Sequence, residues 1–361
     1  MSTTVSASTD HGCLLVADIS GYTSYLMGSE LDHAQDVLGD LMETVVRALE
    51  ATFRVSKLEG DAAFAYAVVD RIDASMLLDT IDACYFTFRA RLRDVDRATS
   101  CDCNACVLIP HLDLKVIVHH GAFARRKVAG SEELTGRDVI LVHRLLKNSV
   151  SETFGVRGYA LLTDACVDAM GIDPEPLGYR RHVERYDDLG TVSGYVGDLE
   201  ERWLAEQERR RVYVTPADAA FEVTSGVFTA PPEVVWEFLT VPERRALWGA
   251  DRVDQVAGGA RRGVGTTNHC IHGKDVIVEH LLDWRPFRYY TVGYTFPLLG
   301  DWYWTLELEP VDEGTRVHVR PVAYSGRRAV LIRLFRRKVE RDFAAAFERL
   351  GAVLDRELAT V

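Results

Sequence analysis

The sequence contains little that points to a membrane, to nucleic acid or to secretion. No apolar run approaches the roughly 20 residues of a membrane-spanning helix, and the polar start MSTTVSASTDHG lacks the charged and then apolar pattern of a secretory signal. Acidic residues outnumber basic residues by 54 to 42, which argues against the basic surface of a general nucleic-acid binder. We therefore expect a soluble, cytoplasmic protein with no membrane span and no nucleic-acid partner.

The chain has seven cysteines in 361 residues, and their number and spacing do not predict a disulfide framework. Three of them, Cys101, Cys103 and Cys106, crowd into SCDCNAC, which is tight enough to wrap one soft cation. Zn²⁺ or an iron–sulfur cluster would need a fourth ligand there. The candidates for that ligand are Cys84, His111 and His119. The alternative is a set of reduced, partly buried thiols.

The length predicts two domains, since about 100 to 200 residues make one. The apolar patterns of residues 12–205 give the order β-α-β-β-α-β, which predicts an α+β, ferredoxin-like sandwich. Within it, LDLKVIVHHGAFARRKV is interpreted as a strand pair and GRDVILVHRLLKNSV as a helix. A charged stretch without strand pattern places a linker at 206–217, and a second domain follows at 218–358.

Two carboxylates stand at the ends of predicted strands. Asp18 ends the first strand, CLLVADIS, and Asp61 lies in the hairpin turn of SKLEGDAAFAYA. The first and third strands of a ferredoxin-like sheet are neighbours, so both carboxylates can converge above one edge of the sheet. Such a pair is typical of an Mg²⁺ or Mn²⁺ site whose remaining oxygens come from a triphosphate. Taken singly, each aspartate is more simply a helix cap or a turn residue.

The segments VADISGYTSYL and KLEGDAAFA resemble the two metal motifs of the class III nucleotidyl cyclases. The resemblance spans about residues 12–200 and makes Asp18 and Asp61 the ligands of two metal ions, with the carbonyl of Ile19 assisting. One ion would activate the ribose 3′-hydroxyl, and the other would hold the triphosphate while pyrophosphate leaves. Lys57 falls at the position that reads the purine base.

The segment EELTGRDVILVHRLLKNS is similar to the third region of that family. The similarity makes Glu133 a base reader and Arg144 the residue that stabilises charge on the phosphate. The family's asparagine, four residues before the arginine, is Ile140 here, which cannot hydrogen-bond a ribose. Asn148, four residues after Arg144, is expected on the same helical face as a substitute.

The resemblance also implies a C2 homodimer, because the family builds each site with metal ligands from one chain and the arginine from the other. Lys57 and Glu133 favour adenine, since the lysine can donate to N1 and the acid can accept from the exocyclic amine. The first interpretation is a divergent cyclase that converts ATP to a 3′,5′-cyclic nucleotide. The alternative is a catalytically inactive scaffold or nucleotide sensor, with Ile140 marking the lost catalysis.

The segment APPEVVWEFLTVPERRALW resembles the opening of START-like domains, the superfamily that includes polyketide cyclases and lipid carriers. The resemblance covers about residues 218–358 and implies a helix-grip fold with a hydrophobic small molecule or a lipid in its cavity. A third interpretation is that this domain is an enzyme acting on a polyketide-like substrate, but no acid–base pair stands out in its sequence. RRAVLIRLFRRKVERDF predicts a basic amphipathic helix that contacts anionic lipid or the nucleotide domain, or else presents a solvated face.

Overall fold

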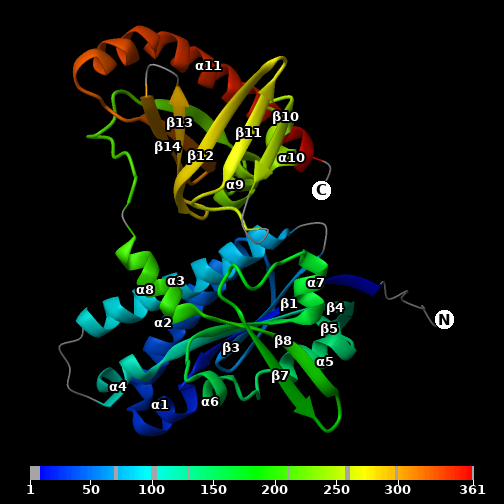
Figure 1. Ribbon diagram of the computed structural model, residues 1–361. Coiled ribbons are helices and arrows are strands. Elements are labelled where there is room, and N and C mark those ends of the chain that lie inside the picture. Colours follow the sequence, from blue (N-terminus) through cyan, green and yellow to red (C-terminus); the bar gives the residue numbers. More distant parts are fainter. Residues whose placement is uncertain are drawn as a thin grey trace. The chain divides into compact units, whose positions relative to one another are not determined.

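The computed structural model describes residues 9–68, 72–98, 104–128, 131–209, 211–256, 261–296 and 300–359. The chain divides into two compact units, one of Met1–Arg209 with Gly259–Arg261 and one of Arg210–Gly258 with Arg262–Val361. Each unit has its own sheet and helices, which confirms the predicted α+β class (Figure 1). Among the helices of the described residues, none has both the length and the apolar character needed to cross a membrane.

The described part of the first unit is built on a sheet of order β2-β3-β1-β4-β6-β8-β7, to which β5 is added by pairing with β4. Neighbouring strands are antiparallel except β4 and β6, which run parallel. The strands are β1 (Thr9–Ser20), β2 (Arg54–Glu59), β3 (Ala62–Val68), β4 (Asp113–Val128), β5 (Ser131–Thr135), β6 (Tyr159–Thr163), β7 (Arg180–Tyr186) and β8 (Gly190–Asp198).

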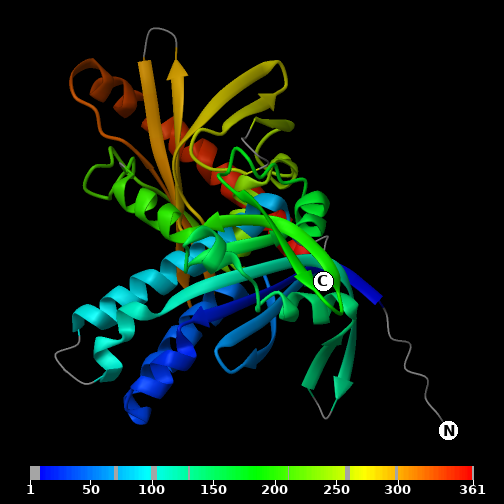
Figure 2. The ribbon, with the colours of Figure 1, turned by 60° about the horizontal axis from the view of Figure 1, so that its bottom comes forward.

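Side chains on both faces of the central strands are buried. Leu14 and Val16 of β1 join an apolar cluster that includes Val142, whereas Leu15, which points the other way, is equally buried. The long helices α2 and α3 pack side by side (Figure 2). The helices are α1 (Tyr22–Gly28), α2 (Leu31–Glu50), α3 (Ala74–Ala98), α4 (Asn104–Val107), the 3-10 helix η2 (Ile109–His111), α5 (Arg137–Arg144), α6 (Val150–Phe154), α7 (Asp164–Met170) and α8 (Leu199–Glu208).

All but the first residue of LDLKVIVHHGAFARRKV form the single 16-residue strand β4, so the prediction of a strand pair is wrong. Gly121 lies inside this strand, where the side chain of Asp138 approaches the backbone. A Cβ atom at Gly121 would lie 2.4 Å from Asp138 Oδ2, and that oxygen accepts a hydrogen bond from the N–H of Ala122 at 2.7 Å. Gly121 therefore does not mark a turn; it leaves room for the Asp138 side chain beside the backbone of β4.

The described part of the second unit is an antiparallel sheet of order β10-β11-β12-β13-β14-β15-β9. The predicted Pro-Pro helix start and the long C-terminal helix are both present, as α9 and α11. Its strands are β9 (Val223–Phe228), β10 (Arg252–Val256), β11 (Thr267–His272), β12 (Asp275–Arg285), β13 (Tyr289–Phe296), β14 (Gly300–Val311) and β15 (Gly314–Pro321). Its helices are α9 (Pro232–Thr240), α10 (Pro242–Ala246) and α11 (Gly326–Leu358).

The core of the second unit forms around Trp236 of α9, which is fully buried. Its ring centroid lies 4.7 Å from that of Trp284 and 5.7 Å from that of Tyr290. The segment before β9 also joins this unit, because the N–H groups of Val212 and Val214 donate to side chains of β12 and β14, each at 2.9 Å.

Candidate functional site

The two predicted metal ligands lie together at one end of the first sheet. Asp18 of β1 pairs with Ala62 of β3 on one side and with Lys115 of β4 on the other, so the side chains of this row share one face. Asp61 precedes Ala62 in the β2–β3 turn, and its carbonyl oxygen accepts a hydrogen bond from the N–H of Ile19 at 3.0 Å. The turn is thereby joined to the end of β1, which places Asp61 beside Asp18.

The two carboxylates repel each other. Burial and the charge of Asp18 raise the pKa of Asp61, while Lys115 opposes the rise. Asp18 is only 9% exposed, so water screens the pair poorly. The end of β1 is therefore a place where a positive charge is favourable.

Lys115 supplies a positive charge at this place. Its Nζ atom lies 2.9 Å from Asp18 Oδ2 and donates a hydrogen bond to the carbonyl of Leu146 at 3.2 Å. The sequence motifs did not identify this residue. The sequence could have indicated it. Lys115 lies two residues before the buried Ile117 on a central strand, so both side chains point to the same face, and a charge on a buried face needs a partner.

A second group of charges continues the row toward β2. Glu59 pairs with Ala62 across the hairpin, and its carboxylate lies 2.5 Å from Lys57 Nζ and 2.9 Å from His143 Nε2. Glu59 therefore has two cationic or titratable partners, although it lies next to the hairpin turn. Lys57, the predicted base reader, is held by Glu59 at the mouth of an open pocket.

The pocket has a volume of about 430 Å³. It brings together Lys57 and Arg144, the two cationic residues that the sequence resemblance singled out. The Arg144 side chain is 45% exposed and lies 3.6 Å from Asp188. The lining residues are Lys57, Glu59, Val139, Ile140, His143, Arg144, Lys147 and Asp188. Ile140, which replaces the family's asparagine, thus lies on the pocket wall, 62% exposed.

Glu133 is not among the residues that line this pocket. It lies on β5, opposite Arg126 of β4, and is half-buried. The pairing of Glu133 with Lys57 at one adenine base therefore stays a prediction.

Asn148 does not lie on the helical face of Arg144, because α5 ends at Arg144 itself; that expectation was wrong. Its amide is used within the loop between α5 and α6. The Nδ2 group donates to the carbonyl of Leu145 at 2.7 Å, and Oδ1 accepts from the N–H of Val150 at 3.0 Å and from the hydroxyl of Tyr159 at 2.9 Å. The amide that would orient a ribose is thus already occupied.

The cysteine cluster gives no metal site in the described part of the chain. Cys101 and Cys103 lie outside the described residues, and Cys106 is half-buried on α4. Cys84 is fully buried, and burial raises the pKa of its thiol to about 12, as expected for an inert core cysteine. Among the residues that the structure describes, no three His, Cys, Asp or Glu side chains gather in a geometry that could hold a metal ion.

The second unit contains a buried ion pair. Arg245 of α10 makes two hydrogen bonds to the Glu279 carboxylate of β12, at 2.5 and 2.6 Å. Glu279, with its side chain 4% exposed, also accepts hydrogen bonds from Tyr294 at 2.9 Å and from Asn268 at 3.3 Å. This carboxylate is therefore fully satisfied by the protein.

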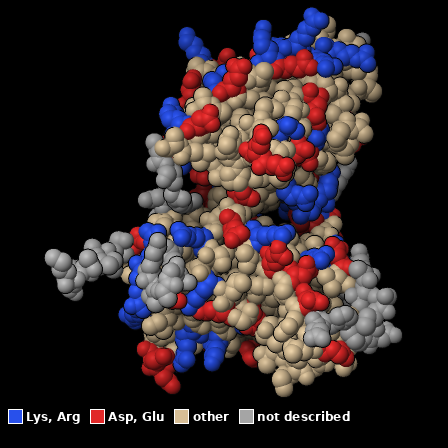
Figure 3. All heavy atoms as spheres, turned by 180° about the vertical axis from the view of Figure 1, so that it is seen from behind, with Lys and Arg blue, Asp and Glu red and all other residues tan. Residues whose placement is uncertain are grey.

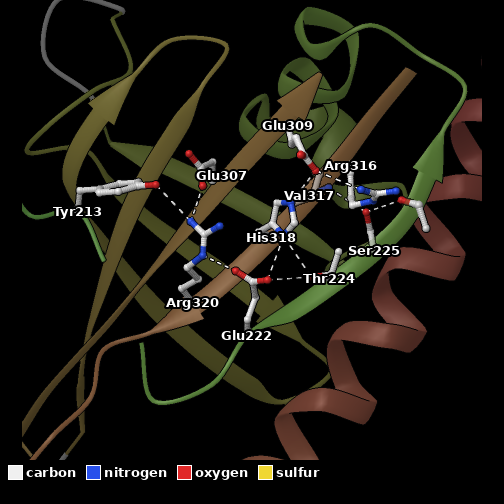
Figure 4. Close-up of polar contacts among 11 residues, drawn as sticks. Tyr213, Glu222, Thr224, Ser225, Glu307, Glu309, Arg316, Val317, His318 and Arg320 are labelled. Carbon is white, nitrogen blue, oxygen red and sulfur yellow. Dashed lines mark hydrogen bonds and ion pairs between the residues drawn. The ribbon is translucent and has the colours of Figure 1, made fainter. Parts of the chain in front are cut away.

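A second charged network crosses the edge formed by β14, β15 and β9 (Figure 4). The Arg320 guanidinium binds Glu222 and Glu307, and its Nη1 donates to the hydroxyl of Tyr213 at 3.2 Å. His318 lies between Glu222 and Glu309, at 3.3 and 3.1 Å. Charges alternate across the strands, as is typical of a stabilising ladder.

Two parts of the chain match known protein families. Residues 219–355 match the family described as polyketide cyclase / dehydrase and lipid transport, which confirms the START-like assignment of this part. Residues 38–153 match a family described as protein of unknown function (DUF2652). The uncharacterized protein Rv2561/Rv2562 of Mycobacterium tuberculosis is 36% identical over 134 residues, which make up 36% of this chain and 60% of that protein. The chain thus spans about 60% of the length of this relative.

Solved structures similar to the N-terminal half include adenylyl and guanylyl cyclases. The guanylyl cyclase Cya2 is 13% identical, with a TM-score of 0.40 over 53% of this chain and 92% of that chain. For the C-terminal part, protein MLL2253 of Mesorhizobium loti is 18% identical, with a TM-score of 0.31 over 38% of this chain and 96% of that chain.

Proposed function

We propose that the first unit binds a purine nucleoside triphosphate together with divalent cations and converts it to a 3′,5′-cyclic nucleotide and pyrophosphate. The observation that carries this proposal is the juxtaposition of Asp18 and Asp61 at the end of β1, where burial and mutual repulsion raise the pKa of Asp61. Two neighbouring carboxylates, of which Asp18 is buried and Asp61 half-buried, favour a multivalent cation.

The donor set fits Mg²⁺ or Mn²⁺, because both ions prefer hard oxygen ligands. Asp18 and Asp61 would hold the ions, and the main chain of Ile19 is adjacent to both. When bound, the ions would make the ribose 3′-hydroxyl more acidic and neutralise charge on the triphosphate. Lys115 would have to leave Asp18, since its ammonium group now lies 2.9 Å from that carboxylate.

The substrate assignment depends on the pocket beside the carboxylates. Lys57 presents an ammonium that can donate to N1 of adenine, which is why we favour ATP. Arg144 is 45% exposed and would stabilise charge on the phosphates, either in its own chain or across a homodimer. Glu133, which does not line this pocket, would read the base of the partner's nucleotide if a homodimer forms.

The second candidate function is a nucleotide sensor without turnover. It is favoured by the amide of Asn148, which is bound within its own loop, and by Ile140 at the usual asparagine position. In that case the START-like unit would hold the regulatory ligand, a hydrophobic small molecule or a lipid.

The test is incubation of the full chain with ATP, GTP, CTP or UTP and Mg²⁺ or Mn²⁺, with mass spectrometry of the products. We expect a cyclic purine nucleotide from the unaltered chain and a rate at least ~100-fold lower for Asp61→Ala, the usual loss when one transition-state contact is removed. Asp168→Ala, which removes an exposed acid of α7 that does not line the pocket, is the matched control and should change the rate only a few-fold.

Two other results have definite meanings. Metal-dependent ATP binding without a cyclic product would select the sensor function. Absence of nucleotide binding, with the chain shown to be folded by circular dichroism, would refute both functions.

A further inference from the structure

The first half of α11 carries apolar side chains that the described part of its own unit leaves exposed. Toward the C-terminal end of the helix, Leu350 and Leu354 are fully buried. In the first half, by contrast, Val330, Leu334 and Phe335 are 57%, 72% and 49% exposed. We call residues 330–341 the α11 stripe.

The stripe is strongly basic in a chain that is acidic overall. Residues 330–341 contain five basic residues and one acidic residue, whereas the whole chain has a net charge of -12. Figure 3 shows Lys and Arg side chains along its upper edge, where Figure 1 places α11. The five basic residues are Arg333, Arg336, Arg337, Lys338 and Arg341.

Helical spacing places these charges beside the apolar residues. Val330, Leu334, Arg337 and Arg341 follow one another at intervals of four, three and four residues, so they lie along one line of the helix surface. Arg333 and Arg337 are both exposed and lie one turn apart. The stripe therefore has exposed apolar side chains with cationic side chains next to them on the helix surface.

We propose that the α11 stripe docks on an anionic lipid surface. Val330, Leu334 and Phe335 would enter the boundary between headgroups and acyl chains, and Arg333 and Arg337 would bind the headgroups. Charge complementarity selects this partner, because an anionic surface attracts the basic stripe although the chain as a whole is acidic. This proposal does not depend on nucleotide cyclisation.

The experiment is sedimentation of the full chain with vesicles of phosphatidylcholine alone or mixed with phosphatidylserine, at low and high salt. We expect binding to the anionic vesicles that weakens with salt, because salt screens the headgroup attraction. Leu334→Ser/Phe335→Ser and Arg333→Glu/Arg337→Glu should each lower partitioning at least ~10-fold. The matched control, Leu204→Ser/Arg157→Glu, changes an exposed leucine and an exposed arginine elsewhere and should bind as the parent does.

Three results would overturn the proposal. They are an absence of binding to anionic vesicles, equal binding to neutral vesicles, and equal loss in the control variant. A stripe variant that changes the oligomeric state instead of vesicle binding would show that a second copy of the chain covers the stripe. Circular dichroism melts of all variants verify that the fold is kept, since every substituted side chain is exposed.

Discussion

Substitution of Lys115 by methionine should tighten the binding of Mn²⁺ at Asp18 and Asp61. In the parent chain, a metal ion competes with the Lys115 ammonium, which lies 2.9 Å from Asp18 Oδ2. Methionine has a similar length and no charge, so it removes the competitor and keeps most of the packing. The prediction concerns the metal alone and requires neither nucleotide nor turnover.

The size of the effect follows from the contact that is lost. The Lys115 and Asp18 side chains are 19% and 12% exposed, so solvent screening is limited. A hydrogen bond to a charged group contributes about 1.5–3 kcal/mol, and about 1.4 kcal/mol is a factor of ten, so Mn²⁺ should bind about 10- to 100-fold more tightly. Without metal, the same substitution leaves Asp18 unpaired and should lower the melting temperature.

Titration calorimetry with Mn²⁺ and no nucleotide measures the affinity. Lys147→Met is the matched control, because Lys147 is an exposed lysine on the neighbouring pocket wall, and it should bind Mn²⁺ as the parent does. Adding Asp61→Asn to Lys115→Met should abolish the gain. The reasoning is refuted if Lys115→Met binds Mn²⁺ no more tightly than the parent, or if Lys147→Met shows the same gain.

Two further predictions concern stability. Arg245→Met leaves the buried Glu279 without its cation and should lower the free energy of unfolding by about 3–5 kcal/mol. The control is Arg244→Met, which should lower it by under ~1 kcal/mol in the same denaturant titration, because the partners Glu237 and Glu357 are partly exposed. Equal losses would contradict this prediction. Burial lowers the pKa of His119 below its ordinary value of 6.5. The unfolded chain therefore takes up a proton at a higher pH than the folded chain does. Neutral His119 stabilises the fold fully above pH 6.5, and this stabilisation is lost as the pH falls below 6.5. Melting temperatures between pH 8 and 5 should therefore fall less steeply for His119→Gln than for the exposed-site control His272→Gln.

The juxtaposition of Asp18 and Asp61 could be predicted from the sequence, because strand patterns determine which strands pair and in which register. Asp18 ends an apolar strand and Asp61 lies in a tight turn, so pairing of β1 with β3 places them together. The 33-residue helix α11 was predictable for a similar reason, since its apolar spacing is long and regular.

The end of α5 could not be predicted in the same way, because the burial of two apolar side chains five residues apart decides it. Leu145 and Val150 are both buried in one cluster, yet five residues along a continuous helix turn the side chain by about 140° from its starting direction. The chain has to leave the helix between them to bury both. Asn148 occupies that break, and its amide satisfies the backbone groups that the break exposes.

The loop between α5 and α6 therefore links Lys115, which pairs with Asp18, to the amide of Asn148. Lys115 donates to the carbonyl of Leu146 in this loop while it neutralises Asp18. Tyr159, which pairs with Lys115 across β4 and β6, donates its hydroxyl to Asn148 in the same loop. Movement of the Lys115 ammonium away from Asp18 would thus alter the contacts of the loop that immobilises the Asn148 amide. If the proposed metal ions displace Lys115 from Asp18, the two proposed functions predict different outcomes: a cyclase would require the loop to release the Asn148 amide, and a sensor would not.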